Sequence, residues 1–556
     1  MKDDQGSASY AGRWVARLRG KIIAQGGTPE LARRAAQSSR HKENPEIIYM
    51  SAFFSLPPLI ERIKGLLPPE QDVYLVGGAV RDLFLNRISR DFDFALASSG
   101  ISFARKIANR LGADYVTLDD ERDTGRVIVT ETDGTRTFLD FATYRSDSLE
   151  ADLRGRDFTI NALAYDLRND TIIDPLEGAA DLRAKRIRAC SPTSFLDDPV
   201  RILRAVRMAA AFGFQIEKSS RELMRQAGDQ VGRVSPERLR DELFKILEGP
   251  KPDASIRALE MLGVIQQLMP ELIEMQGVEQ SPPHVYDVWT HTLAVLSELE
   301  SLLAALRVGY SAEETTDLFT GLLTLRLGRY REKFAEHFAA SLNTDRSVRA
   351  LLFFAALYHD ARKPQTKSWD EKRDRIRFFD HDVQGAETAA ERARFFNLSN
   401  DEIERLKIII KNHMRIHFHG SRMAGENRVP SRRAIYRFFR ESGEAGVDLV
   451  LLGLADLRGT QANALTQDTW SAYLEVSRIL LENYWEKPQE TVAPPRLVNG
   501  DDLMRELKLQ PGPVIGELLE AIRERQATGK IETREQAIEY AHERWTSQPN
   551  EDKSKS

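Results

Sequence analysis

An α+β fold, with a small mixed-sheet head followed by mostly α-helical domains, is the fold class that the sequence predicts. Between about residues 72 and 143, short apolar runs of strand length alternate with helical patterns, which favours a sheet flanked by helices. From about residue 180 onward, apolar residues recur almost entirely at helical spacing. The chain has 556 residues, too many for one ordinary core, so we expect several domains.

The expected elements of the head follow from the spacing of its apolar residues. Alternation of apolar and polar residues indicates a strand, and apolar residues three or four positions apart indicate a helix. We expect strands at 72–77, 92–97, 113–118, 126–131 and 137–143, and helices at about 46–66, 79–86 and 101–111.

Composition limits the kind of protein. Hydrophobic residues make up 42% of the chain and charged residues 29%, which is typical of globular proteins. The single cysteine, Cys190, excludes an internal disulfide framework and a cysteine metal cluster, and it fits a reducing cytosol. No stretch approaches the roughly 20 apolar residues of a membrane span, so we expect a cytoplasmic protein. The net charge of −5 argues against indiscriminate coating of nucleic acid, although a local basic surface remains compatible with it.

Residues 75–94, LVGGAVRDLFLNRISRDFDF, carry the most information. Asp91 and Asp93 alternate with phenylalanines, which places both carboxylates on one face of a strand, about 7 Å apart at the backbone. Mg²⁺ prefers such paired carboxylates together with substrate phosphates. The pair Gly77-Gly78 lets backbone N–H groups approach a phosphate closely. These features suggest two-metal nucleotidyl transfer, and a solvated edge strand after a tight turn is the simpler alternative.

The order of strand, Gly-Gly, Arg-Asp and Asp-x-Asp resembles motif A of tRNA nucleotidyltransferases and bacterial poly(A) polymerases. These enzymes form the second class of the polymerase-β-like nucleotidyltransferase superfamily, and the resemblance covers roughly residues 50–545. It implies a polymerase-β-like head in which Asp91 and Asp93 hold two Mg²⁺ ions. It also implies that Gly78 and Arg81 hold the triphosphate of the incoming nucleotide.

Two further stretches of the head are similar to the same family. In the run TFLDF, Asp140 resembles a third carboxylate that helps to deprotonate the 3′-hydroxyl nucleophile, although an edge-strand acid is the alternative. The run DLRGRDFTINALAY resembles the motif RRDFTINA, which is associated with ribose recognition; Gly155 replaces its first arginine. Arg156 matches the second arginine, whose guanidinium can bind phosphate or ribose oxygens, and Asp157 can accept from a 2′-hydroxyl.

The run DDPVRILRAVR begins at Asp197 and is expected to be helical. Asp198 and Arg201 then share one helix face, and Arg204 and Arg207 continue the row, as in any exposed salt-bridged helix. The run also resembles motif D of the family, usually Glu-Asp-x-x-Arg, with Asp197 in place of the glutamate. In that motif an aspartate accepts from the exocyclic amine of C or A, and an arginine donates to the ring acceptors beside it. Arg204 and Arg207 would serve the triphosphate.

A second set of metal-ligand residue types lies in the helical part of the chain. Neutral imidazoles and carboxylates are good ligands for a divalent metal, although a lone histidine is more often an ordinary core residue. The order His, His-Asp, His, His, Asp resembles the HD phosphohydrolase superfamily. It implies a divalent ion such as Ni²⁺, Mg²⁺ or Mn²⁺ and phosphohydrolase action on RNA 3′ ends. The implied ligands are His291, His359, Asp360, His381, His413 and Asp456.

The residues and the resemblance together predict five regions. The first is rich in arginine and is expected to be a solvated extension or an RNA-contacting arm. The last resembles a tRNA-contacting tail, and a simple helix–turn–helix packing unit is the alternative. The regions are a basic N-terminal extension at 1–45, a nucleotidyltransferase head at 46–180, a helical neck and RNA-binding region at 181–275, an HD domain at 280–485 and a C-terminal helical unit at 495–546.

The predicted activity is CCA addition to tRNA, with tRNA, CTP and ATP as partners and Mg²⁺ as cofactor. An A-adding enzyme, a CC-adding enzyme and a poly(A) polymerase share the same motifs and remain alternatives. A different class of function, an HD phosphohydrolase whose head only binds RNA, is disfavoured by the intact Asp-x-Asp pair.

Overall fold

The computed structural model describes residues 10, 12–38, 44–50, 56–311, 313, 317–343 and 346–547. The chain divides after Val234 into two compact units, and each has its own buried apolar core. Among the described residues, no helix is both long enough and apolar enough to cross a membrane.

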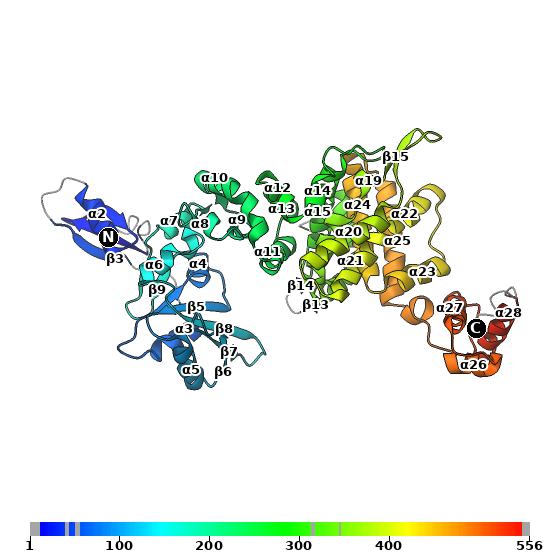
Figure 1. Ribbon diagram of the computed structural model, residues 1–556, viewed down its shortest axis with the longest axis horizontal. Helices are drawn as coiled ribbons and strands as arrows, with labels where there is room; N and C mark the ends of the chain where they lie inside the picture. Colours follow the sequence, from blue (N-terminus) through cyan, green and yellow to red (C-terminus); the bar gives the residue numbers. More distant parts are fainter. Residues whose placement is uncertain are drawn as a thin grey trace. The chain divides into compact units, whose positions relative to one another are not determined.

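The first unit is built on a mixed sheet of seven strands in the order β10-β9-β4-β5-β8-β7-β6 (Figure 1). Strands β5 and β8 run parallel, and all other neighbouring strands are antiparallel. The small mixed-sheet head is therefore confirmed. The strands are β4 (Val73–Val76), β5 (Asp91–Leu96), β6 (Asp114–Asp119), β7 (Thr124–Thr130), β8 (Arg136–Thr143), β9 (Ala164–Asp166) and β10 (Thr171–Ile173).

Helix α5 (Gly100–Leu111) packs against β7 and β8. Phe103 and Ile107, one turn apart, are buried on the side of the helix that faces the sheet. A Cβ at Gly100 would lie 2.4 Å from the carbonyl oxygen of Phe141, so only glycine allows the helix to start this close to β8. This packing fixes the buried face of the sheet and leaves the opposite face for polar residues.

The described residues before 51 form a small folded layer, which corrects the expectation of a solvated extension. Three strands pair in the order β2-β1-β3, and α2 (Pro29–Gln37) packs on them. Arg13 is buried, with Nη2 3.0 Å from Glu177 Oε1 in the head. The N–H group of Ile172 in β10 donates to the Tyr49 hydroxyl at 2.8 Å. The strands are β1 (Arg13–Leu18), β2 (Lys21–Gly26) and β3 (Glu46–Met50).

The predicted helix over 46–66 is therefore wrong in its first part. Residues 46–50 form β3, and only the later part is helical, as α3 (Pro58–Gly65). Ile-Ile-Tyr favours a strand, and β3 is stabilised by pairing with β1, far back in the sequence. A local window of the sequence does not contain that partner.

The predicted neck over 181–275 is divided between the two units. Its first helices belong to the unit that carries the sheet, and its later helices belong to the second unit. They are α8 (Ser194–Asp197), α9 (Arg201–Phe212) and α10 (Lys218–Ala227) in the first unit, and α11 (Pro236–Glu248) and α12 (Pro252–Met261) in the second.

The second unit is mostly helical, as predicted. Its central helix, α24 (Ala445–Gln461), is buried along nearly its whole length and packs against α15, α21 and α22. Apolar residues occur on all sides of such a helix because neighbours surround it. The other long helices here are α15 (Val288–Ala305), α16 (Leu318–Leu327), α17 (Arg331–Ala339), α18 (Val348–Tyr358), α20 (His381–Phe395), α21 (Asn400–Asn412), α22 (Met414–Glu426), α23 (Arg432–Ser442) and α25 (Gln467–Trp485).

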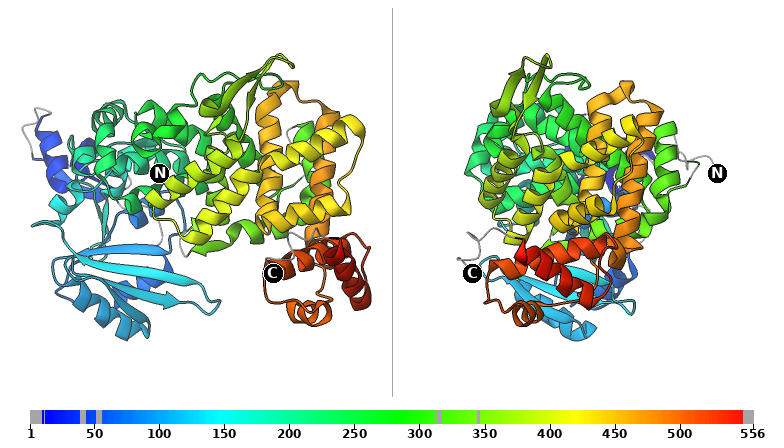
Figure 2. Two further views of the ribbon diagram at one scale, coloured as in Figure 1. Left: turned by 45° about the vertical axis from the view of Figure 1, so that its right-hand side comes forward. Right: turned by 90° about the vertical axis from the view of Figure 1, so that its right-hand side faces the viewer.

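The last three helices form a small bundle with its own core, drawn in orange to red in Figure 2. Leu503, Leu518 and Ala537, one from each helix, are buried in that core. The bundle is fixed to α23 because Arg437 Nε donates to Glu524 Oε1 at 2.7 Å. The helices are α26 (Gly500–Leu507), α27 (Pro513–Ala527) and α28 (Arg534–Thr546).

A buried ion pair stabilises the second unit. Arg346, just before α18, donates from Nε and Nη2 to the two oxygens of Glu402 in α21, at 2.7 and 2.9 Å. Both side chains are almost fully buried. Removal of one partner of such a pair leaves a buried charge that has lost its compensation.

We expect Glu402→Ala to lower the free energy of opening of α21 by about 3–5 kcal/mol. Native-state hydrogen exchange of the α18 and α21 amides measures this change. Glu336→Ala is the matched control, because Glu336 forms an exposed pair with Lys333 at 3.3 Å and should matter little. Equal protection of α21 in both variants would contradict the stabilising role of the buried pair.

Candidate functional site

Strand β5 presents its two aspartates on the face opposite its two phenylalanines. Phe92 and Phe94 are buried, and Phe94 stacks on Phe141 of β8 with ring centroids 4.5 Å apart. Asp91 and Asp93 are exposed. The two carboxylates therefore share one face of the strand, as the period-two alternation predicts.

Asp140 joins this face from the neighbouring strand. It is in parallel register with Asp93, and β7 brings Arg126 opposite it. Arg126 donates to both carboxylate oxygens of Asp140, from Nε at 2.7 Å and from Nη2 at 2.8 Å. Asp140 therefore lies beside the two strand acids as half of an ion pair. Sequence reasoning missed Arg126, because only the strand register brings it to this position.

The electrostatics at Asp93 favour a cation. Although the Asp93 side chain is accessible at the surface, the protein atoms around it displace much of its water, and this desolvation raises the pKa of Asp93 above its usual value; Arg156 lowers the pKa, and Asp140 and Asp91 raise it again by repulsion. Carboxylate oxygens grouped in this way are the ligands that Mg²⁺ prefers in proteins. The donor set on this face of the sheet therefore fits Mg²⁺.

Gly77 forms the bend between β4 and α4 (Gly78–Phe84). Its φ of +72° and ψ of −132° are strained for any residue with a side chain. A Cβ at Gly77 would lie 2.7 Å from Arg156 Nη1 and 3.8 Å from Asp93 Oδ2. The bend, the guanidinium and the carboxylate are therefore immediate neighbours. The Arg156 guanidinium is oriented by Asp152, whose Oδ2 is 3.1 Å from Nη2.

Arg81 is held by three neighbours. Its Nε donates to Asp82 Oδ1 at 2.9 Å, and its Nη1 donates to Asn161 Oδ1 at 2.8 Å. Its Cζ lies 4.6 Å from the centre of the Phe212 ring in α9. Phe212 was not a sequence candidate, and this contact links the Gly-Gly bend to α9.

Asp157 connects residues 152–165, here called the ribose motif, to α9. Its Oδ1 accepts from the Phe158 amide at 2.7 Å and from Asn161 Nδ2 at 2.9 Å. Its Oδ2 is 2.8 Å from Arg204 Nε. Asp157 is almost fully buried, and its carboxylate orients Asn161 and Arg204. The prediction that Asp157 accepts from a 2′-hydroxyl did not include these two partners.

The expected helix from Asp198 to Arg201 is wrong in one respect. Asp198 lies outside α9, with an extended backbone (φ −150°, ψ 93°) directly after α8. Pro199 disfavours the helical conformation in the residue before it, which explains the break. The two side chains still approach each other, with Asp198 Oδ2 3.9 Å from Arg201 Nε.

Arg201 is fixed by acceptors from two segments. Nη2 donates to the Gly155 carbonyl at 3.1 Å, and Nη1 donates to the Ser194 hydroxyl at 2.9 Å. Nη1 also lies 3.4 Å from the Arg156 carbonyl oxygen. The ribose motif and the start of α9 are thereby joined, and Arg207 lies one turn beyond Arg204 on the same helix.

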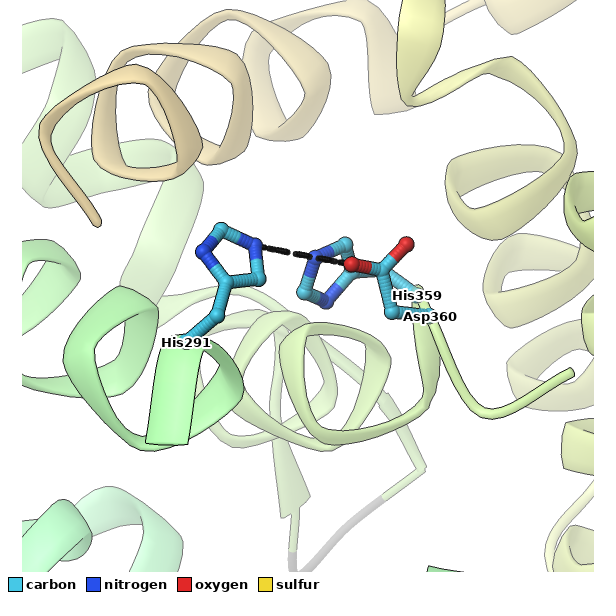
Figure 3. A group of neighbouring side chains, drawn as sticks. All are labelled: His291, His359 and Asp360. Carbon is cyan, nitrogen blue, oxygen red and sulfur yellow. Dashed lines mark hydrogen bonds and ion pairs between the residues drawn. The ribbon is translucent and has the colours of Figure 1, made fainter. Parts of the chain in front are cut away.

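The second unit brings the six predicted histidines and aspartates into one buried cluster. Figure 3 shows one half of it, in which His291 and His359 lie around Asp360. Asp360 Oδ2 is 3.5 Å from His291 Nε2 and 3.2 Å from His359 Nε2, and the two nitrogens are 3.3 Å apart. Asp456 Oδ1 closes this half, 3.2 Å from His291 Nε2.

The other half of the cluster mirrors the first. Asp360 Oδ1 is 3.5 Å from His381 Nε2 and 3.9 Å from His413 Nε2, and these nitrogens are 3.3 Å apart. Ligands at about 2.1 Å from a tetrahedral metal lie about 3.4 Å from one another. Each oxygen of Asp360 thus faces its own pair of imidazoles at ligand spacing, and the residues fit two ions that share one carboxylate.

The imidazoles are oriented for ligation. Nδ1 of His359, His381 and His413 donates to a backbone carbonyl at 2.7, 2.7 and 2.6 Å respectively, which leaves each Nε2 directed into the cluster. Burial, helped by His381 and His359, lowers the pKa of His413 to about 3. A neutral imidazole is the form that binds metal.

Three residues of this cluster were missed in the sequence. His417 Nε2 is 2.7 Å from Asp456 Oδ2, Lys363 Nζ is 2.7 Å from Asp360 Oδ2, and the ring of His284 is 5.6 Å from that of His291. Lys363 stands three residues after Asp360, so the sequence could have indicated that the two side chains are neighbours. Only the structure shows that the Lys363 side chain is buried.

Family models match four parts of the chain, one of which, the probable RNA and SrmB-binding site of polymerase A, covers residues 213–275. The poly(A) polymerase head domain matches residues 73–188, the HD domain matches residues 324–439, and tRNA nucleotidyltransferase domain 2 matches residues 494–541. Together with the carboxylates on the mixed sheet, they define a nucleotidyltransferase with an appended HD domain.

Two relatives resemble nearly the whole chain. The A-adding tRNA nucleotidyltransferase of Deinococcus radiodurans is 31% identical over 486 residues, 86% of this chain and 97% of the relative. The CC-adding tRNA nucleotidyltransferase of Thermus thermophilus is 30% identical over 474 residues, 84% of this chain and 92% of the relative. A solved CCA-adding enzyme in complex with CTP shares the fold, with a TM-score of 0.57, 23% identity and coverage of 88% of this chain and 97% of that chain. The chain belongs to the tRNA nucleotidyltransferase family.

We expect Gly77→Ala to lower kcat/KM for nucleotide incorporation about 100-fold, because the new methyl group would displace Arg156 beside Asp93. Gly443→Ala is the matched control, since Gly443 has nearly the same backbone conformation, φ +53° and ψ −135°, but its Cβ would meet open space. Steady-state kinetics with CTP measure both variants. Equal losses would mean that backbone strain alone, and not the contact with Arg156, causes the defect.

Proposed function

We propose that this protein completes the 3′ end of tRNA by adding C, C and A from CTP and ATP. One continuous series of contacts carries the proposal. Asp93 and Arg156 both adjoin Gly77, and Arg201 binds the carbonyl oxygens beside Arg156 and lies next to Asp198. Carboxylates for metal ions, a bend for phosphates and a pair of base-reading groups thus lie within one neighbourhood.

Each group in this neighbourhood has a chemical role. Two Mg²⁺ ions held by Asp91 and Asp93 would stabilise charge on the attacking and leaving oxygens. The 3′-hydroxyl of tRNA attacks the α-phosphate of the nucleotide, and pyrophosphate leaves. Arg81 and the Gly78 backbone orient the triphosphate, and Arg156 binds the ribose–phosphate part. Asp140 forms an ion pair with Arg126, so it can accept a proton only after that ion pair has separated.

Base selection would depend on Asp198 and Arg201. A carboxylate accepts from the exocyclic amine that C and A share, and the guanidinium donates to the adjacent ring acceptor. Uracil lacks the amine, and guanine presents a donor where an acceptor is needed. Asp198 has an extended backbone and lies between two helices, so the direction of its side chain is not fixed by a helix. Arg204 and Arg207 are proposed to contact the triphosphate.

A-adding and CC-adding activities are the nearest alternatives, because the two relatives above are named for them. Poly(A) polymerase activity would use the same head. No residue of the described site separates these outcomes, since all of them require the same carboxylates and the same reading of C or A. An enzyme that acts on tRNA would work in the cytoplasm.

We further propose that the HD cluster binds two divalent ions and hydrolyses phosphoesters at RNA 3′ ends. The arrangement of two imidazole pairs around Asp360 supports this. Nitrogen-rich sites favour transition metals such as Mn²⁺ or Ni²⁺ over Mg²⁺. A head that only binds RNA, beside an active HD domain, is the alternative from another class of function.

A tRNA trimmed of its 3′ end distinguishes these activities. We expect incorporation of two C residues with CTP alone, and of CCA with CTP and ATP together, as measured by product sequencing. Addition of A only, to a tRNA that already ends in CC, would identify an A-adding enzyme. Asp91→Ala should abolish all incorporation because it removes a metal ligand, while phosphoester hydrolysis by the HD domain should persist. Equal loss of both activities would contradict separate sites.

The metal content of the HD cluster can be measured without any activity. The metals are first removed from the Asp91→Ala protein with a chelator. We expect this protein to bind two Mn²⁺ ions tightly when it is then titrated with Mn²⁺. In the same background His381→Ala should reduce the number to one, since only the His381 half loses a ligand. His337→Ala removes a histidine of the same unit that lies on Asp448 instead, and it should leave the number at two. A single ion in all three proteins would contradict a shared Asp360.

A further inference from the structure

The carboxylate face of the head sheet continues beyond Asp93 toward the sheet edge (Figure 1). The strand register places three residues beside Asp93 in one cross-strand row: Asp140 of β8, Arg126 of β7 and Val116 of β6. Cross-strand partners lie on the same face of a sheet, and α5 packs on the opposite face. Asp93 is exposed, and Val116 is 45% exposed although it is apolar. This row is therefore accessible at both ends.

Arg126 presents a flat cation within this row. Its Nε and Nη2 donate to the two oxygens of Asp140 at 2.7 and 2.8 Å, which aligns the edge of the guanidinium with the carboxylate. Its Cζ lies over the Phe138 ring of β8, 5.0 Å from the ring centre. The carboxylate thus occupies the edge of the guanidinium, and the ring lies on one face. Since the Arg126 side chain is 32% exposed, the second face is the part that a flat ligand can reach.

The aspartates of β5 lie within electrostatic reach of Arg126. The hydrogen bond that Arg126 donates to Asp140 raises the pKa of the guanidinium above its ordinary value, and burial lowers this pKa. The charges of Asp140, Asp91 and Asp93 raise the pKa of Arg126 further. Because Arg126 reaches back to Asp140, its guanidinium lies over β8, the strand next to β5. A ligand on this guanidinium is consequently a neighbour of the carboxylates that fit Mg²⁺.

The geometry of the proposed transfer decides which part of the substrates reaches this guanidinium. The triphosphate is proposed to bind at Gly78 and Arg81, just after β4, and β4 pairs with β5 on the side away from β8. In phosphoryl transfer the attacking and leaving oxygens are roughly in line, on opposite sides of the phosphorus. Pyrophosphate then leaves toward β4, and the attacking 3′-oxygen comes from the side of β8. The nucleoside that carries this oxygen therefore lies over β8 and β7.

We propose that the last nucleoside of the tRNA acceptor end lies over β8 and β7, with its base stacked on the exposed face of the Arg126 guanidinium. This inference rests on the proposed nucleotidyl transfer and deepens it, because it assigns a binding residue for the acceptor base. Unpaired RNA bases stack on aromatic rings and on guanidinium planes. Stacking accepts any base, which suits an end whose last base changes with each addition. The ion pair stays closed in this arrangement, so Asp140 acts by orienting Arg126.

The test measures the incorporation of one nucleotide by the full-length protein into two tRNA primers that lack the CCA end. In one primer the last nucleotide is intact, and in the other it has no base but keeps its ribose and 3′-hydroxyl. Stacking of one base contributes about 1–3 kcal/mol, so kcat/KM for the primer at saturating CTP should be roughly 5- to 150-fold lower without the base. For a protein that adds only A, ATP and primers that end in CC, with and without the last base, take their place.

The variant Arg126→Lys separates stacking from charge. Lysine keeps a positive charge beside Asp140 but has no flat face. The variant should lower kcat/KM for the intact primer roughly 5- to 150-fold. On the abasic primer it should match the wild-type protein, because no base remains to stack. KM for CTP should be the same in both proteins.

Arg105→Lys is the matched control. Arg105 also lies beside a ring of this sheet, with Cζ 5.1 Å from the centre of the Tyr115 ring in β6. It belongs to α5, however, which packs on the face of the sheet opposite the carboxylates. This variant should behave like the wild-type protein with both primers.

The outcomes separate the stacking proposal from the proposed transfer. If the wild-type protein extends both primers equally well, the base is not stacked, while nucleotidyl transfer stands. Equal loss on both primers in Arg126→Lys would show a general effect on the carboxylates and would also overturn the stacking proposal, as would an equal defect in Arg105→Lys. If the wild-type protein extends no primer with CTP or ATP, the proposed transfer fails, and the stacking proposal fails with it.

Discussion

The register of strand β5 between β4 and β8 is the constraint on which the head depends. Phe92 and Phe94 must face the core, where Phe94 stacks on Phe141, and Asp91 and Asp93 consequently face outward. Because side chains alternate along a strand, a shift of one residue would bury both carboxylates and expose both rings. Burial of the two rings therefore holds the carboxylates in place. The fold positions its charged groups through apolar packing in the layer beneath them.

The arginines around these carboxylates are held by protein acceptors. Arg156 is bound to Asp152, Arg81 to Asn161, and Arg201 to the carbonyl of Gly155. A long side chain that is already ordered loses less entropy when a substrate binds. The same bonds join the Gly-Gly bend, the ribose motif and α9 into one arrangement, so the pieces of the site hold each other in position.

The second unit uses the ends of helices to place its histidines. His359 follows α18, His381 begins α20 and His413 lies between α21 and α22. At each of these positions the ring can reach a carbonyl oxygen of the preceding residues through Nδ1, which aims Nε2 at Asp360. Asp360 and the long buried helix α24, which supplies Asp456, then bring ligands from distant parts of the sequence together.

The sequence by itself determined the period-two face of β5 and the mixed-sheet head, because these depend on residue type and local spacing. The resemblance to the HD superfamily, and not the spacing, singled out the six residues that the structure brings together. Only the tertiary structure decided that 46–50 pairs with β1 and that Arg126 binds Asp140. The same holds for the approach of His417 to Asp456. The physical reason is common to all three cases: each depends on a partner that lies outside the local periodic pattern. Strand pairing and helix packing supply that partner only after the chain has folded.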